Sequence, residues 1–338
     1  MEKFISVIIP NYNGGATIGK CLEAAFASDY TSFEVIVADD GSTDNSVEII
    51  KRFPCRLVQL EKHGGASKAR NSGARQSRGE LLFFTDADCL FAPDSLSLAN
   101  RAASDKGDRC IIGGTYTPRP YDNDFFSIFQ SVFIHYSETK KCDKPDYIAS
   151  HAMVIHASTF KESCGFPEDF MPILEDVEFS HRLLRKGITL AMDAALQVQH
   201  IFRFTMKKSL GNAYRKTKYW ICYSLANRDL LADSGTASLE LKVSGFAWLA
   251  SAFVVLCGII SGNMFFLLPL PVLLGVAAFV NRKLFSLFHK TGGCSFAVRA
   301  KLYYTLVYPA AVWAGTVAGL VEFLRRRFYA RTNSAPTS

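Results

Sequence analysis

The sequence lacks any closely spaced pair of cysteines. Its nine cysteines are scattered, without a C-x-x-C pair, and several lie among apolar neighbours, where a free cysteine behaves as a small core residue. We therefore expect no disulfide framework and a reducing compartment for the main domain. The cysteines with apolar neighbours are Cys21, Cys55, Cys110 and Cys257.

We also expect no secretory signal peptide, because the apolar run Phe4–Ile9 is too short for one and predicts a first β-strand instead. Charge is scarce in 243–280 and 303–323, whereas 1–235 has the composition of a globular domain. The uncharged stretches contain three segments that are near the shortest length able to cross the hydrocarbon core of a bilayer. These segments are Val243–Ile260, Met264–Val280 and Tyr303–Phe323.

The first two apolar segments are joined by Ser261-Gly262-Asn263 and are expected to form a tight hairpin. Basic residues flank both of its ends, which predicts that both ends are cytoplasmic. The third segment ends at Arg325-Arg326-Arg327, a cluster that a simple crossing would place outside, against this bias. Pro309, Gly315 and Gly319 would permit a kinked or re-entrant path, so the topology of the third segment stays open.

The net charge of +7 is compatible with either nucleic acid or an anionic membrane as a partner. Basic residues concentrate next to the apolar segments, which favours lipid headgroups and predicts a membrane partner and no nucleic acid. Aromatic residues are mixed with these basic residues in 204–235, as in a helix at a membrane interface, and an ordinary packing helix is the alternative. The basic residues before and after the apolar segments are Lys207, Lys208, Arg215, Lys216, Lys218, Arg325, Arg326 and Arg327.

Strand and helix patterns alternate over the first hundred residues, which predicts an α/β domain with parallel strands and right-handed crossovers. Ser42 is expected to cap the helix that follows the second strand, and 116–146 is expected to be a mobile loop or a plain surface excursion. The predicted strands are Phe4–Ile9, Phe33–Ala38, Arg56–Leu60, Leu81–Thr85, Cys110–Thr115 and Tyr147–Ile155, and the predicted helices are Thr17–Ala27, Thr43–Arg52, Ala66–Gln76 and Pro93–Ser104.

Two acids, Asp86 and Asp88, follow the buried strand Leu81–Thr85. Residues two apart on a strand point the same way, and open α/β sheets bind ligands at the carboxyl ends of their strands. Paired hard oxygen ligands there suit a divalent cation that holds a diphosphate. A turn, in which aspartate is common, is the alternative.

Two further loops follow predicted strands, Pro10–Gly15 and Asp39–Asp44. A glycine-bearing loop that enters a helix can hold a phosphate or the edge of a nucleotide, and an aromatic ring such as Tyr12 can stack on a base. Turn chemistry accounts equally well for Asn, Gly and Asp at these positions. The pair Glu175-Asp176 precedes a helical pattern, where acids either favour the helix dipole or act in catalysis.

In order along the chain, the motifs Pro-x-Tyr-Asn, Asp-Asp-Gly-Ser-Thr-Asp, Gly65–Gly73 and Thr85-Asp86-Ala87-Asp88 resemble those of the family 2 glycosyltransferases. The resemblance covers residues 4–205. It implies an inverting enzyme with the GT-A fold, which has a mixed, mostly parallel sheet with helices on both faces. It also implies a nucleotide-sugar donor, with a UDP-sugar favoured over a GDP- or dTDP-sugar.

The same resemblance implies a role for each motif residue. Asp88 and His200 would hold Mg²⁺ or Mn²⁺, Asp176 would be the general base, and Glu175 would position the acceptor or the base. His151, His156 and His181 are expected to be structural histidines, with a place near the acceptor the alternative for His151. The residues expected to bind the nucleotide are Pro10, Tyr12, Asp39, Asp40, Arg70 and Asp86.

Processive members of the family carry a Gln-x-x-Arg-Trp motif, whereas this chain has Arg215–Trp220 at the comparable place. We therefore expect transfer of one sugar, or few, to a lipid-linked acceptor. The absence of a convincing Ser-His or Cys-His signature agrees with a single displacement, which needs no enzyme nucleophile.

The predicted organisation is a GT-A domain over 1–203, an interfacial region over 204–235, membrane helices over 243–323 and a basic tail over 324–338. A multi-pass protein of the inner cell membrane with a cytoplasmic catalytic domain follows from this organisation. One alternative is a nucleotidyltransferase, which Pro10–Gly15 disfavours because it contains no cation. The other is a catalytically silent binding module anchored in the membrane.

Overall fold

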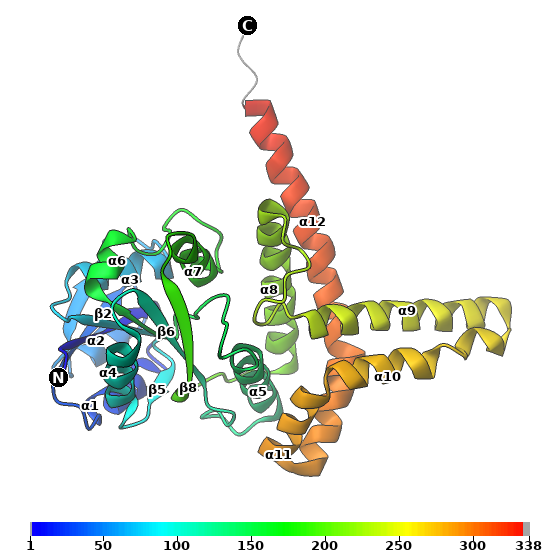
Figure 1. The fold of residues 1–338 in the computed structure, drawn as a ribbon, viewed down its shortest axis with the longest axis horizontal. Helices are drawn as coiled ribbons and strands as arrows, with labels where there is room; N and C mark the ends of the chain where they lie inside the picture. The colour runs from blue at the N-terminus through cyan, green and yellow to red at the C-terminus, as the bar shows by residue number, and fades with distance from the viewer. Residues whose placement is uncertain (1, 334–338) are drawn as a thin grey trace, which may run out of the picture. The chain divides into compact units, whose positions relative to one another are not determined.

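The computed structural model describes residues 2–333, with side chains up to Phe328. The described chain forms two compact units (Figure 1). Of the described residues, the first unit comprises 2–123 and 134–203, and the second comprises 124–133 and 204–333. Helix α5 (Phe125–Thr139) contributes its first residues to the second unit and its remainder to the first.

An eight-stranded mixed sheet organises the described residues of the first unit (Figure 1). Its strand order is β3-β2-β1-β4-β7-β6-β8-β5, with β3, β2, β1 and β4 parallel to one another. Strand β7 runs antiparallel to β4 and β6, and β5 runs antiparallel to β8. The strands are β1 (Ile5–Asn11), β2 (Phe33–Asp39), β3 (Arg56–Gln59), β4 (Leu81–Thr85), β5 (Cys89–Phe91), β6 (Cys110–Tyr116), β7 (Ala152–His156) and β8 (Thr189–His200).

Helices connect these strands except β4 and β5, which follow one another directly. Apart from the added strand β5, the predicted alternation of strand and helix over the first hundred residues is confirmed. In α1 the residues Ile18, Cys21, Leu22 and Ala25 are buried, which is the spacing of one helix face. The helices of the first unit besides α5 are α1 (Ile18–Phe26), α2 (Ser46–Ile50), α3 (Ala66–Arg75), α4 (Ser95–Lys106), α6 (Ala157–Glu162) and α7 (Glu175–Arg185).

Both faces of the sheet are covered at β4. Neighbouring residues of this strand point to opposite sides, and each side packs against other side chains. The ring of Phe84 lies 5.1 Å from that of Phe160 and 5.2 Å from that of Phe166, among side chains that include residues of α6 and α7. Phe83 points the other way and contacts Phe91, with 5.2 Å between ring centroids. Burial of each such ring contributes about 1.5–3 kcal/mol, so β4 is held from both sides.

The region 116–146 contains a 15-residue helix, α5, so the prediction of a loop there was wrong. Apolar residues recur at helical spacing at Phe125, Phe129, Val132 and Phe133, and the last three are buried. Prolines at 118 and 120 and charges around 140–145 flank this pattern and hid it. Burial of the aromatic face therefore outweighs the loop-forming residues on either side.

Ser42 does not cap the helix that follows β2, so the prediction of this cap was wrong. Helix α2 begins only at Ser46, with Asn45 at its N-cap position. The Ser42 hydroxyl donates to Asp39 Oδ1 at 2.6 Å, and the Ser42 N–H donates to Asp39 Oδ2 at 3.1 Å. This local turn competes with helix formation and delays the start of α2 by one turn.

The second unit is helical, and an aromatic cluster lies at its centre. Phe129 of α5 contacts Tyr303 at 4.9 Å and Phe288 at 5.4 Å between ring centroids. The helices are α8 (Met206–Asn227), α9 (Leu239–Ser261), α10 (Leu270–Val280), α11 (Arg282–Leu302) and α12 (Tyr308–Asn333), with a 3-10 turn η1 (Met264–Leu267) and a π-helical turn η2 (Tyr303–Val307).

Helix α8 packs closely against α12, and two glycines of α12 make this approach possible. A Cβ added at Gly315 would lie 2.5 Å from the carbonyl oxygen of Tyr214, and one at Gly319 would lie 2.5 Å from that of Lys218. The glycines therefore serve helix packing, and α12 is continuous through both of them.

Among the residues that the structure describes, two helices are long and apolar enough to cross a membrane, Leu239–Ser261 and Arg282–Phe328. The expected segment Met264–Val280 is a shorter apolar stretch made of η1 and α10, and its crossing of a membrane stays a prediction. Helices α9 and α10 run side by side (Figure 1), and the basic tail predicted from 324 continues α12 to Asn333; 334–338 lie outside the described residues.

Candidate active site

The ends of β1 and β2 are joined by a buried side-chain network. Asn11 Nδ2 donates to Asp39 Oδ1 at 2.7 Å and contacts Ser46 Oγ at 3.0 Å. Asp39 is 1% exposed, and both of its carboxylate oxygens accept hydrogen bonds within this network. Asp39, which was expected to help bind the nucleotide, thus shapes the loop after β2, and Asn11 was missed by the sequence analysis.

Asp40 joins the loop after β3 to the end of β2. Its carboxylate accepts hydrogen bonds from the N–H groups of Gly64 at 2.8 Å and Gly65 at 2.7 Å, and it contacts His63 Nδ1 at 2.8 Å. The His63 ring in turn stacks on Tyr12, with 4.1 Å between centroids. Tyr12 stays 50% exposed, so this aromatic pair presents ring surface at the same edge of the sheet.

Arg70 of α3 contacts two carboxylates that come from distant parts of the chain. Its guanidinium donates to Asp86 Oδ1 at 2.7 Å and to Glu175 Oε1 at 2.8 Å, and Arg70 itself is 4% exposed. Burial alone would raise the pKa of Asp86, but the adjacent Arg70 charge outweighs it and holds that pKa below its usual range. Arg70 therefore ties the segment after β4 to the start of α7.

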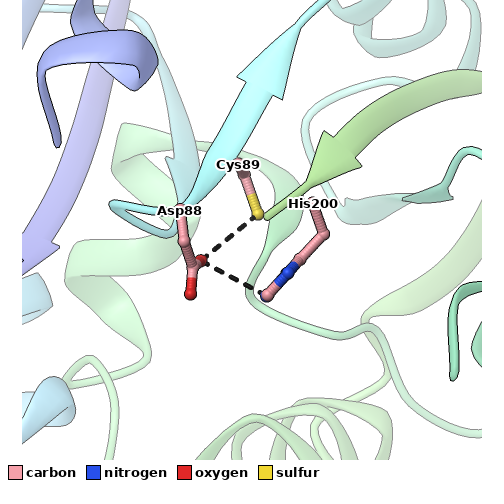
Figure 2. A group of neighbouring side chains, drawn as sticks. All are labelled: Asp88, Cys89 and His200. Atoms are coloured by element: carbon pink, nitrogen blue, oxygen red, sulfur yellow. Dashed lines mark hydrogen bonds and ion pairs between the residues drawn. The ribbon is translucent and has the colours of Figure 1, made fainter. Parts of the chain in front are cut away.

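Asp88, Cys89 and His200 form a compact cluster where β5 begins and β8 ends (Figure 2). Asp88 Oδ1 lies 3.4 Å from His200 Nε2 and 3.8 Å from Cys89 Sγ. Cys89 and His200 are paired residues of the antiparallel β5–β8 ladder, which brings the histidine beside the aspartate. The Ile201 N–H donates to the Asp88 carbonyl oxygen at 2.9 Å and fixes the same register.

The Asp88 carboxyl and the Cys89 thiol both have raised pKa values, for different reasons. Partial exclusion of water and then the charge of Asp86 raise the pKa of Asp88 to about 7, although 39% of the Asp88 side chain stays accessible to solvent. Burial raises the pKa of the Cys89 thiol well above its usual value, so Cys89 stays protonated. Asp88 is thus poised to lose its proton when a cation binds beside it.

Asp88 and His200 fit a divalent cation, and Cys89 does not. Two ligands at adjacent positions of one octahedral ion lie about 3 Å apart, close to the 3.4 Å between Asp88 Oδ1 and His200 Nε2. A neutral buried thiol is a poor ligand for the hard cations that carboxylates prefer. Among the residues that the structure describes, this is the cluster of ligand-type side chains that could hold a metal ion.

Asp176 lies in the first turn of α7 behind a strained residue. Leu174 adopts a left-handed conformation, with φ 74° and ψ 20°, that is uncommon for its type and that clusters at functional sites in proteins. Asp176 accepts hydrogen bonds from the N–H groups of Val177 at 2.9 Å and Ser150 at 3.3 Å. Burial and then the charge of Glu175 raise the pKa of Asp176 to about 6, which suits a base that works near neutral pH.

The predicted site residues thus lie in several separate sets of contacts. Arg70 contacts both Asp86 and Glu175, and Asp88 contacts His200. Asp176 is bonded to the backbone N–H groups of Ser150 and Val177, and Pro10, Tyr12, Asp39 and Asp40 lie at or just after the ends of β1 and β2. The sequence analysis missed Asn11 and His63, and it assigned no role to Cys89. The contacts of these three residues are with distant parts of the chain, which leave no local signal in the sequence.

Comparison with known proteins identifies the domain. Residues 6–162 match the family model described as glycosyl transferase family 2. Glycosyltransferase GlyG of Streptococcus pneumoniae serotype 4 is 32% identical over 131 residues, which cover 37% of this chain and 44% of GlyG. Glycosyltransferase AglE of Haloferax volcanii is 42% identical over 93 residues, covering 25% of this chain and 31% of AglE, so the chain spans less than half of either relative.

The fold has a solved counterpart in the mannosyltransferase PcManGT of Pyrobaculum calidifontis. The two structures superpose with a TM-score of 0.59 over 95% of this chain and 88% of that one, at 19% identity. This likeness confirms the predicted GT-A fold class, with its mixed sheet flanked by helices. Residues 6–162 therefore carry a glycosyltransferase family 2 domain.

Proposed function

We propose that the chain is an inverting, metal-dependent glycosyltransferase that moves a sugar from a nucleotide-diphosphate sugar to an acceptor hydroxyl. The observation that carries this proposal is the double contact of Arg70. It binds Asp86, two residues before Asp88, and Glu175, one residue before Asp176. A single buried side chain thereby links the segment that carries the candidate metal ligand to the segment that carries the candidate base.

The donor would lie across the carboxyl ends of β1, β2 and β4, where open α/β sheets bind ligands. The exposed face of Tyr12 offers a stacking surface for the base of the nucleotide. Asp88 and His200 would hold Mg²⁺ or Mn²⁺; the structure of PcManGT is of a complex with GDP-Man and Mn²⁺. When bound, such a cation neutralises negative charge that develops on a departing diphosphate.

The reaction would be a single displacement. Asp176 accepts the proton of the acceptor hydroxyl while the hydroxyl oxygen bonds to the anomeric carbon, and the bond from that carbon to the diphosphate oxygen breaks. Attack from the face opposite the diphosphate inverts the anomeric configuration. Glu175, held by Arg70, lies beside Asp176, and its charge adds to the effect of burial in raising the pKa of the Asp176 carboxyl.

The test is release of nucleoside diphosphate by the purified full chain. A panel of UDP-, GDP- and dTDP-sugars is supplied with Mn²⁺ and then with EDTA, and release from at least one donor is expected only with the metal. Release of pyrophosphate instead of nucleoside diphosphate would identify a nucleotidyltransferase. Binding of a donor without any turnover, with lipid-linked acceptors present, would identify a binding module and contradict the proposal.

We further propose that the enzyme resides in the inner cell membrane, with a cytoplasmic catalytic unit and a lipid-linked acceptor. Large apolar side chains of α9 and η1 face away from the protein, with Phe253 64%, Ile260 78% and Phe265 76% exposed. Soluble proteins rarely expose so much contiguous apolar surface. The absence of the Gln-x-x-Arg-Trp motif supports the transfer of one sugar, or few, rather than processive synthesis.

A cavity within the second unit supports the choice of acceptor. It has a volume of about 180 Å³, and apolar side chains such as Ala213 and Trp220 line it together with Lys216 and Lys242. Apolar walls suit a hydrocarbon chain, and the two lysines complement the charge of a phosphate on that chain. The occupant proposed for this cavity is therefore the tail of an anionic lipid.

Gly245 lines the cavity and allows a direct test of this occupant. A Cβ there would make only an ordinary contact of 3.5 Å with Trp313, so Gly245→Leu fills space rather than breaking the fold. Transfer to a polyprenyl-phosphate-linked acceptor is expected to fall severalfold in this variant. The matched control is Gly275→Leu on the exposed side of α10, where a Cβ meets nothing within 4 Å; equal rates in both variants would contradict the assignment.

A further inference from the structure

A buried carboxylate–imidazole pair lies beside the site and has no part in the chemistry above. Glu138 Oε2 of α5 lies 3.4 Å from Nε2 of His151, the residue that precedes β7. The two residues are 9% and 6% exposed, and both belong to the first unit. A pair so deeply removed from water costs free energy that an apolar pair would not, so its presence calls for a role other than stability.

Both members of the pair are fixed by strands of the sheet. Thr115 Oγ1 of β6 donates to Glu138 Oε2 at 2.8 Å. Thr85 Oγ1, at the end of β4, donates to the carbonyl oxygen of His151 at 2.9 Å. Burial alone would lower the pKa of His151, but the Glu138 carboxylate outweighs it and raises that pKa.

The ring of Tyr116 connects this pair to the candidate metal site. It stacks on His151 with 3.9 Å between ring centroids, and it meets the His200 ring edge-on at 4.8 Å. Tyr116 is 6% exposed, so it has little freedom to move away from either ring. The opposite packing partner of His200 is Phe202, stacked at 3.9 Å.

The contacts therefore run without a gap from Glu138 through His151 and Tyr116 to His200, which faces Asp88 at 3.4 Å. We propose that Glu138 and His151 are positioning residues that hold the Tyr116 ring, and through it keep His200 Nε2 turned toward Asp88. The inference rests on the metal site of the proposed glycosyltransferase. Groups that orient a metal-binding histidine commonly set its affinity for the metal.

The test is Mn²⁺ affinity, measured on the full chain in detergent by the electron paramagnetic resonance signal of free Mn²⁺, without nucleotide. Glu138→Gln keeps the shape of the side chain but removes the charge that holds His151. We expect its dissociation constant for Mn²⁺ to rise about tenfold. Donor binding in EDTA, which does not depend on the metal, should change by less than about twofold if only His200 has lost its orientation.

A pair of substitutions at Tyr116 separates ring packing from general stability. Tyr116→Phe keeps the stacked ring and is expected to bind Mn²⁺ like the wild type, whereas Tyr116→Leu loses the ring and should match Glu138→Gln. These two variants decide the question even if Glu138→Gln fails to fold. The control is Thr159→Val, which removes a buried hydroxyl bond to the Asp108 carbonyl oxygen at 2.7 Å and should leave Mn²⁺ binding unchanged.

Wild-type Mn²⁺ affinity in both Glu138→Gln and Tyr116→Leu would overturn the positioning role and leave the proposed function intact. A wild-type chain that binds no Mn²⁺ at all would overturn the metal site, and the positioning role with it. A loss of affinity in Thr159→Val equal to that in Glu138→Gln would assign the effect to general destabilisation and would also overturn the inference.

Discussion

The two units of the chain differ in the exceptions that they make to the burial of apolar side chains. In the first unit, charged groups are buried and bonded, as with Asp40 after β2 at 2% and Arg70 of α3 at 4% exposure. In the second unit, large apolar groups are exposed, as with Phe253 at 64% and Ile260 at 78%. Buried polar groups need fixed partners, whereas exposed apolar groups need a second apolar phase. The first pattern supports the proposed reaction site, and the second supports the proposed membrane surface.

The largest effect on activity is expected for Asp176→Asn, which tests whether the buried charged groups of the first unit form a reaction site. A general base contributes about 10²–10⁴-fold to the rate, so kcat should fall by that range while Mn²⁺-dependent donor binding is kept. Steady-state release of nucleoside diphosphate and titration of the donor measure the two quantities. The matched control is Glu178→Gln in the same helical turn, where the side chain contacts Arg182 instead.

Similar losses in Asp176→Asn and Glu178→Gln would mean that these acids act through the helix dipole. In that case the first turn of α7 would be structural, and the base would have to be sought elsewhere.

The second prediction concerns Asp88→Ala. Loss of a metal ligand should weaken donor binding about 10- to 100-fold in Mn²⁺ and leave donor binding in EDTA unchanged. Isothermal titration with the nucleoside diphosphate measures both conditions. Asp105→Asn, an exposed acid of α4, serves as the control for the change in net charge. Equal weakening with and without the metal would assign Asp88 to direct contact with the donor.

The third prediction follows from the pKa of Asp176, raised to about 6 by burial and by Glu175. The base is protonated below that pH, so kcat/KM should fall about tenfold for each pH unit below 6 and level off above it. The sign for stability is opposite. A carboxyl pKa raised in the folded state stabilises at low pH, and that stabilisation is lost as the pH rises through about 6.

Thermal unfolding of Asp176→Asn checks the stability half of this prediction. The variant should melt at a higher temperature than the wild type at pH 7.5 and at the same temperature at pH 4. A lower melting temperature at pH 7.5 would show that the Asp176 carboxylate stabilises the fold, contrary to its raised pKa.

The smallest effect is expected in the second unit, for Gly315→Ala. The new methyl group would lie 2.5 Å from the Tyr214 carbonyl oxygen, so α8 and α12 must separate. Overpacking of this kind costs about 1–3 kcal/mol. The midpoint of thermal unfolding in detergent should fall by a few degrees per kcal/mol. Gly275→Ala, in open space on α10, should leave the midpoint unchanged.

The same contrast explains what the sequence could predict. Strands β1, β2 and β4 have short apolar runs that end in polar residues, so their existence and the position of Asp86 and Asp88 follow from local patterns, and the fold class is confirmed. The apolar helix α9 also follows from a local pattern, because its sequence is a continuous run without charge after Lys242. The catalytic and binding roles came through the resemblance to a family and stay predictions.

The rest depends on contacts between distant residues, which leave no local signature. Arg70 meets Asp86 and Glu175 across 16 and 105 positions of the chain. Glu138 reaches His151 only because α5 is a helix, and its aromatic spacing was hidden between proline-rich and charged segments. Tertiary packing determines the secondary structure and the contacts of such residues, even where nearby residues favour turns.

The most direct test of the central claim is the position of Mn²⁺ in the full chain bound to a nucleoside diphosphate, located by anomalous diffraction. The account predicts one ion within about 2.3 Å of an Asp88 carboxylate oxygen and of His200 Nε2, also bound to the diphosphate. An ion held by other side chains, or a diphosphate bound tightly with no ion between it and Asp88, would contradict it.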